Sequence, residues 1–106
     1  MSFLDFLRGS NINEGVENYK ATQGAFLIDV REDDEFRGGH IPGSKNVPLS
    51  RIGSIKNVVK DTAAPVFVYC LSGARSSQAA GYLKRIGYES VTNIGGISGY
   101  NGSLER

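Results

Sequence analysis

The side chains best placed for chemistry lie around the only cysteine of the chain, Cys70. The apolar run before it, residues 66–69, predicts a buried strand, and the pattern over residues 76–86 predicts a helix. In open α/β sheets, ligands bind at the carboxyl ends of parallel strands, where helix N-termini direct unpaired amides into the crevice. The sequence therefore predicts that Cys70 is a reactive thiol at this edge of a sheet.

The segment Leu71–Arg75, called the Cys70 loop below, predicts a thiol that ionises readily. Gly73 allows successive amide groups to turn toward the sulfur, and the charge of Arg75 lies close to it in sequence. Both favour the nucleophilic thiolate, because the pKa of a free cysteine, about 8.5, falls in electropositive surroundings. The alternative is that Cys70 is a small buried core residue, which is the commoner role of a lone cysteine. Its place between an apolar strand and a Gly/Ser/Arg loop favours catalysis.

Length and composition fit one domain over residues 1–106. The chain is 40% hydrophobic, and 12 basic against 11 acidic side chains leave a formal charge of +1. This balance gives no reason to expect a nucleic-acid or membrane partner. Asp5 interrupts the apolar residues 1–8, so we expect a packing segment rather than a signal peptide, and a cytoplasmic location. The sequence has no Cys/His cluster with metal-ligand spacing, and we expect neither a metal nor another cofactor.

Strands and helices are predicted to alternate along the chain, which is typical of an α/β fold with a mainly parallel sheet. Leu49, Ile52, Ile55 and Val58 or Val59 recur at a spacing that predicts an amphipathic helix packed on the sheet. Asn11 or Asn13 is the expected N-cap of the first helix. The remaining predicted elements are helices over residues 11–20 and 33–38, and strands over residues 25–30, 46–47 and 91–94.

Four motifs resemble, in order, those of the rhodanese family. Residues 27–31 (LIDVR) resemble its first signature, and residues 40–48 (HIPGSKNVP) resemble its HIPGAxNxP segment. Residues 70–76 (CLSGARS) resemble its active-site loop, CxxGxR followed by Ser or Thr. Residues 93–97 (NIGGI) resemble the strand and glycine pair near its C-terminus, although Tyr100 stands where many members have Trp.

The resemblance implies a rhodanese-like fold, with a central parallel β-sheet flanked by helices on both faces. It also implies a sulfurtransferase that carries a sulfane sulfur as a persulfide on Cys70. Thiosulfate is the usual laboratory donor in the family, and cyanide, glutathione or thioredoxin-like protein thiols are acceptors. The residues expected to bind the sulfur and its donor are Leu71, Ser72, Gly73, Ala74, Arg75 and Ser76.

Two other functions stay open at this point. A domain of the same fold would also serve as a carrier or interaction module that holds a persulfide for a dedicated protein partner. A phosphatase-like thiol enzyme is the third possibility. Cysteine-dependent phosphatases have five residues between nucleophile and arginine, whereas four separate Cys70 from Arg75. The shorter loop suits a single sulfur atom better than a phosphoryl group, which favours sulfur transfer.

Supporting roles are expected for Asp29 and Arg31, which lie at the end of a predicted strand. We expect them to fix loops rather than to react. Arg75 either binds the anionic donor or pairs with a carboxylate, for which Asp29 is the candidate. His40 is expected to anchor a turn, because a persulfide mechanism needs no general base once Cys70 is ionised. Arg75 is the only charged residue of the Cys70 loop, so a protein persulfide is an alternative donor to thiosulfate.

Overall fold

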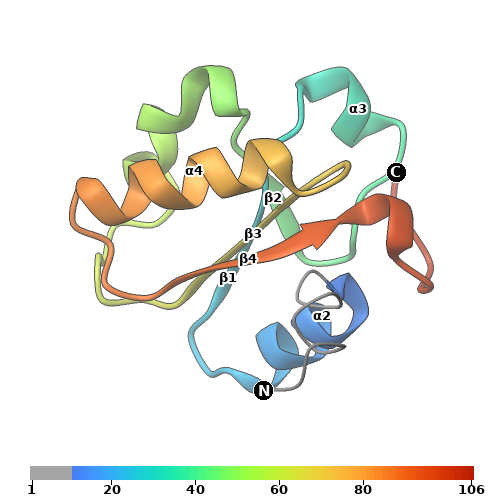
Figure 1. Cartoon of the computed structure of the whole chain (residues 1–106), viewed down its shortest axis with the longest axis horizontal. Coiled ribbons are helices and arrows are strands. Elements are labelled where there is room, and N and C mark those ends of the chain that lie inside the picture. Colours follow the sequence, from blue (N-terminus) through green and yellow to red (C-terminus); the bar gives the residue numbers. More distant parts are fainter. Residues whose placement is uncertain (1–10) are drawn as a thin grey trace.

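The computed structural model describes residues 11–106 and has the predicted alternation of strands and helices (Figure 1). The strands within these residues form one four-stranded parallel sheet in the order β2-β1-β3-β4. The expected packing segment at residues 1–8 lies outside the described residues. The elements are α2 (Ile12–Ala21), β1 (Phe26–Asp29), α3 (Asp33–Arg37), β2 (Ser44–Asn46), η1 (Leu49–Asn57), β3 (Val66–Cys70), α4 (Ala74–Arg85), β4 (Val91–Gly96) and η2 (Ile97–Gly99).

The central strands β1 and β3 place Cys70 at the carboxyl edge of the sheet. All residues of β3 are buried, as expected for an apolar, β-branched run that is covered on both faces. In the register, Asp29 at the end of β1 lies beside Tyr69, and Cys70 lies beside Gly96 at the end of β4. Three strands therefore end near the sulfur, and their loops meet there.

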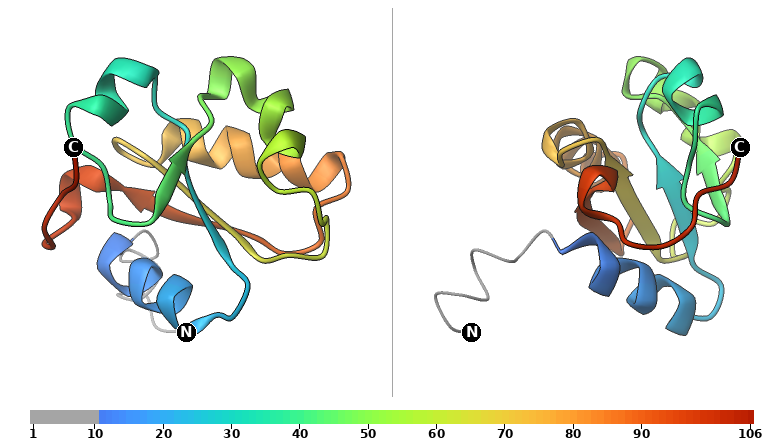
Figure 2. Two further views of the ribbon diagram at one scale, coloured as in Figure 1. Left: turned by 180° about the vertical axis from the view of Figure 1, so that it is seen from behind. Right: turned by 90° about the vertical axis from the view of Figure 1, so that its right-hand side faces the viewer.

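Helices cover both faces of the sheet, which confirms the expected architecture (Figures 1 and 2). Successive strand residues point to opposite faces. Ile28 and Val68 pack under α4 and η1, whereas Leu27 and Phe67 pack under α2 and η2. The sheet thus separates two apolar clusters.

The amphipathic helix predicted after Pro48 is present and packs on the sheet, but it is not an α-helix. The structure has a 3₁₀ helix, η1, with a non-helical residue at Arg51 (φ −130°, ψ 33°). Its buried residues, Ile52 and Ile55, are three positions apart, which matches the three residues per turn of a 3₁₀ helix. Gly53 and the β-branched isoleucines also have a lower α-helical propensity than residues such as Ala or Leu.

The boundaries of β2, β4 and α4 also differ from the prediction. β2 covers Ser44–Asn46 rather than residues 46–47, because pairing with β1 already begins at Ser44. β4 extends to Gly96 because a register shift between Val68 and Tyr69 lets its glycines pair with the end of β3. α4 begins at Ala74 rather than at residue 76, so its first turn includes the last two residues of the Cys70 loop. Of the two expected N-caps, Asn11 and Asn13, the structure has Asn11, whose side chain accepts from the Asn13 amide at 3.1 Å.

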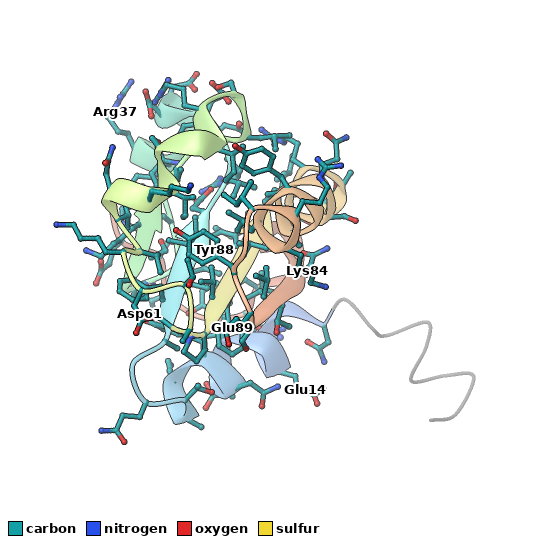
Figure 3. The ribbon with its side chains drawn as sticks, turned by 90° about the vertical axis from the view of Figure 1, so that its left-hand side faces the viewer. Glu14, Arg37, Asp61, Lys84, Tyr88 and Glu89 are labelled. Atoms are coloured by element: carbon teal, nitrogen blue, oxygen red, sulfur yellow. The ribbon has the colours of Figure 1, made fainter. Side chains whose placement is uncertain are left out.

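Tyr88 fastens the far end of α4 to the segment that follows η1 (Figure 3). Its ring is buried, and its hydroxyl donates to the Val59 carbonyl oxygen at 2.6 Å. Burial raises the pKa of Tyr88, so the hydroxyl keeps the proton that it donates. This contact holds in place the helix whose other end adjoins Cys70.

On the opposite face, α2 packs against β4 through Gly15. A Cβ atom at Gly15 would collide with the Ile94 side chain and lie 2.6 Å from its Cγ2 atom. At Gly81, in the middle of α4, a Cβ atom would have no atom within 4 Å apart from its chain neighbours and the helix's own nearby backbone. The two glycines therefore make a matched pair, one enclosed by packing and one open.

We expect Gly15→Ala to lower the free energy of unfolding by roughly 1–2 kcal/mol, because overpacking outweighs the gain in helix propensity. Gly81→Ala should raise it by about 0.5–1 kcal/mol, because the same gain comes without a clash. Urea unfolding of both variants measures the difference. Equal stabilisation by the two substitutions would contradict the close packing of α2 on β4.

Candidate active site

The sulfur of Cys70 lies among the backbone amides that begin α4. The Gly73 amide donates to Sγ at 3.0 Å and the Ser76 amide at 3.4 Å, while the Ser76 hydroxyl oxygen also lies 3.4 Å from Sγ. Cys70 is 1% exposed. Converging amide donors around one buried atom are an arrangement that stabilises negative charge on it.

These donors change the acidity of the thiol. Burial of Cys70 opposes its ionisation, but hydrogen bonds from the Ser76 hydroxyl and from the amides of Ser76, Gly73 and Ser72 outweigh this effect. The pKa of Cys70 therefore lies below its ordinary value. The structure thus supports the electropositive surroundings expected for Cys70.

Two glycines allow the loop to adopt this shape. Gly73 is the N-cap of α4 and has φ +107°, a conformation that side chains other than glycine rarely adopt. At Gly96, a Cβ atom would collide with the Leu71 carbonyl oxygen and lie 2.6 Å from the Ser72 Cα atom. The Cys70 loop therefore rests directly on the backbone of β4.

Arg75 pairs with Glu35 of α3, so the expected partner Asp29 is wrong. The guanidinium donates to both carboxylate oxygens, at 2.7 and 3.0 Å. The hydrogen bond from Arg75 lowers the pKa of Glu35 to about 2, although partial burial opposes this shift. Asp29 does not reach Arg75, because both of its carboxylate oxygens accept hydrogen bonds from Arg31.

Glu35 is a site residue that the sequence analysis missed. It lies 40 positions from Arg75, and only the folded position of α3 brings the two together. The available signal was the acidic first turn of α3, which contains Asp33, Asp34 and Glu35. The pair fastens the first turn of α4 to α3.

Asp29 and Arg31 form a buried ion pair at the end of β1. Arg31 Nη2 lies 2.7 Å from Asp29 Oδ2, and the two side chains are 7% and 0% exposed. Arg31 also donates to the Gly39 carbonyl oxygen at 2.7 Å. Neither side chain is hydrogen-bonded to Cys70 or Arg75 within the described residues. Their contacts fix the loop that follows α3.

His40 lies in that same loop. Its Nδ1 atom is 2.9 Å from the Phe36 carbonyl oxygen, and its ring stacks on Phe36 at a centroid distance of 3.7 Å. Its backbone exchanges hydrogen bonds with Glu105 near the end of the chain. These contacts fit the expected turn anchor.

The remaining residues of the Cys70 loop form the surface around the sulfur. Leu71, Ser72 and Ala74 are exposed, and Leu71 is 47% exposed. An apolar side chain therefore lies next in sequence to the buried cysteine. Ser76, by contrast, is fully buried beneath the loop.

Asn93 of β4 is a second residue missed as a site residue, although it falls within the motif at residues 93–97. Its Nδ2 atom donates to the Gly73 carbonyl oxygen at 3.2 Å. Its Oδ1 atom lies 2.7 Å from the Ser76 hydroxyl and accepts from the Gly95 amide at 3.0 Å. Asn93 thus links the end of β4 to the Cys70 loop.

Two further observations concern the described part of the chain, residues 11–106. No group of three or more His, Cys, Asp or Glu side chains there could hold a metal ion. None of its helices is long and apolar enough to cross a membrane.

Comparison with known proteins identifies the family. The rhodanese-like domain family matches residues 12–103. The chain is 43% identical over 82 residues to uncharacterized protein YqhL of Bacillus subtilis, covering 76% of this chain and 64% of that protein. It is 38% identical over 71 residues to the thiosulfate sulfurtransferase PspE of Escherichia coli, covering 66% of this chain and 68% of PspE.

A solved structure gives the same result. A rhodanese with anions from E. coli superposes with a TM-score of 0.72 and 32% identity, over 77% of this chain and 98% of that one. The chain therefore belongs to the rhodanese-like sulfurtransferase family and has the rhodanese fold.

The ion pair between Glu35 and Arg75 should make stability depend on pH. Because the folded pKa of Glu35 is lowered from 4.5 to about 2, the pair stabilises the fold above about pH 4.5 and loses this effect as the pH falls toward 2. We expect Glu35→Gln to cost roughly 1 kcal/mol at neutral pH. Urea unfolding should show that the difference from wild type disappears near pH 2.

Asp33→Asn is the matched control. It neutralises the Asp33–Arg51 pair, whose side chains are 49% and 55% exposed, so its cost should be below about 0.5 kcal/mol. A difference between Glu35→Gln and wild type that stays constant from pH 7 to 2 would count against the pair.

Proposed function

We propose that the chain is a sulfurtransferase that carries a sulfane sulfur as a persulfide on Cys70. The observation that carries this proposal is the set of amide donors on Sγ, at 3.0 Å from Gly73 and 3.4 Å from Ser76. They favour the thiolate that a nucleophile requires. Membership of the sulfurtransferase family supports the same chemistry.

In the first half-reaction, the Cys70 thiolate attacks the sulfane sulfur of a donor. A sulfur–sulfur bond forms to Sγ, and the donor's own sulfur–sulfur bond breaks. Its electron pair leaves with the released group, which is sulfite when the donor is thiosulfate. The negative charge then resides on the terminal sulfur of the persulfide, beside the amides of residues 71–76.

In the second half-reaction, an acceptor attacks that terminal sulfur. Cyanide, glutathione or a protein thiol, such as a thioredoxin-like one, would form the new bond to sulfur. The bond to Sγ breaks, and its electron pair restores the Cys70 thiolate. When the acceptor attacks as cyanide or as a thiolate already ionised in solution, neither half-reaction needs proton transfer to a general base in the site. No chemical role is therefore expected for His40.

A persulfide carrier for a dedicated protein partner is the second candidate. Two observations favour a protein over a small dianion as the donor or acceptor. Both terminal nitrogens of the Arg75 guanidinium already donate to Glu35, which leaves the Cys70 loop without an unpaired cation. Leu71, beside the sulfur, offers an apolar side chain that is 47% exposed.

Persulfide formation tests the proposal. After incubation with thiosulfate, intact-mass analysis and peptide mapping should show one added sulfur on Cys70, which cyanide or a thiol then removes. Cys70→Ser should melt at the same temperature as wild type and gain no sulfur. A Cys70 that alkylates readily but gains no sulfur from thiosulfate or from a protein persulfide would overturn the proposal.

Two comparisons separate the remaining functions. A sulfurtransferase for small donors should turn over thiosulfate and cyanide repeatedly, whereas a carrier should load once and discharge quickly only to a protein thiol. Aryl phosphate hydrolysis should be absent, because the four-residue spacing between Cys70 and Arg75 is too short to surround a phosphoryl group.

A further inference from the structure

The hydroxyl of Ser76 has more acceptors around it than it can satisfy. Its oxygen lies 2.7 Å from Asn93 Oδ1, 3.1 Å from the Gly73 carbonyl oxygen, 3.4 Å from Cys70 Sγ and 3.5 Å from the Gly95 carbonyl oxygen. A serine hydroxyl has a single hydrogen to donate. Ser76 is 0% exposed, so the choice is made among these protein atoms.

The geometry selects Asn93 while the cysteine is a neutral thiol. A separation of 2.7 Å is the most favourable distance for a hydroxyl donating to an oxygen. The Ser76 oxygen can then accept the weak hydrogen bond of the Cys70 S–H group. The order of donation is from Cys70 to Ser76 to Asn93.

Ionisation of Cys70 makes the sulfur, rather than Asn93, the better acceptor for the Ser76 hydroxyl. A thiolate has no hydrogen and is a stronger acceptor than an amide oxygen, because its hydrogen bonds are charge-assisted. The Ser76 hydroxyl can then turn to Sγ. Asn93 loses little by this, because its Oδ1 atom still accepts from the Gly95 amide at 3.0 Å.

We propose that Asn93 is a positioning residue that competes with the Cys70 sulfur for the hydroxyl hydrogen of Ser76. Asn93 draws the hydroxyl away from the thiol and releases it when the sulfur carries charge. When the charge moves to the terminal sulfur of a persulfide, the hydroxyl returns to Asn93. This inference rests on Cys70 being the reactive sulfur of the proposed function.

Asn93 also supports the loop, and the two roles have opposite effects on the thiol. Its bond to the Gly73 carbonyl oxygen holds the amides against the sulfur, so loss of support would weaken those donors and raise the pKa of Cys70. Loss of competition would free the Ser76 hydroxyl for the thiolate and lower that pKa. The ion pair of Arg75, whose charge interacts with Cys70, and Glu35 stays the same in either case.

The test is the pH dependence of Cys70 alkylation by iodoacetamide. No other thiol contributes to the signal, because Cys70 is the only cysteine. Asn93→Leu should lower the alkylation pKa by about half to one unit, the effect of one hydrogen bond. Ser76→Ala should raise it. In the Ser76→Ala background, Asn93→Leu should not lower the alkylation pKa of Cys70.

A pKa that rises or stays unchanged in Asn93→Leu with Ser76 present would overturn the proposal. If thermal melting shows that Asn93→Leu does not fold, Asn93→Asp is used instead, because the Asp carboxylate accepts from the Ser76 hydroxyl more strongly than the Asn amide oxygen does. That variant should raise the pKa more with Ser76 present than in the Ser76→Ala background, and equal rises would overturn the proposal. Alkylation requires only ionisation, so a failure of sulfur loading does not affect this result.

Discussion

A buried sulfur can carry negative charge only where hydrogen-bond donors replace water, and here the backbone supplies them. The amides of Gly73 and Ser76 lie at the start of α4, where helix geometry leaves N–H groups without partners inside the helix. Pointing them at Sγ satisfies the amides and the sulfur together. The shape of the Cys70 loop, more than the charge of Arg75, therefore determines what Cys70 can do.

The rest of the fold holds this loop in place. The parallel sheet brings the ends of β1, β3 and β4 to one edge, and Gly96 lets the loop rest on β4 without a side chain between them. Two ion pairs brace the surrounding segments: Asp29 with Arg31 after β1, and Glu35 with Arg75 between α3 and α4. Because Arg31 and Arg75 are each paired with a carboxylate, hydrogen bonds from the loop stabilise the charge of a bound sulfur.

Local features of this site could be predicted from sequence, whereas contacts across the fold could not. Alternating apolar runs and the Cys70 loop with its glycine depend on neighbouring residues, so the strands and the position of Cys70 followed directly. Glu35 meets Arg75 only because α3 folds over the edge of the sheet, and neither residue has a sequence spacing that indicates it. The 3₁₀ period of η1 was visible at Ile52 and Ile55, since a spacing of three fits that helix better than an α-helix.

The acidity of the Cys70 thiol in the unmodified chain is the most direct test of the central claim. Thiolate absorbance in the ultraviolet, followed against pH, reports this one sulfur because the chain has no other cysteine. A midpoint below that of a free cysteine, about 8.5, is the result expected because the Ser76 hydroxyl and the amide donors together outweigh burial. A midpoint at or above that value would contradict the claim that the loop stabilises a sulfur anion.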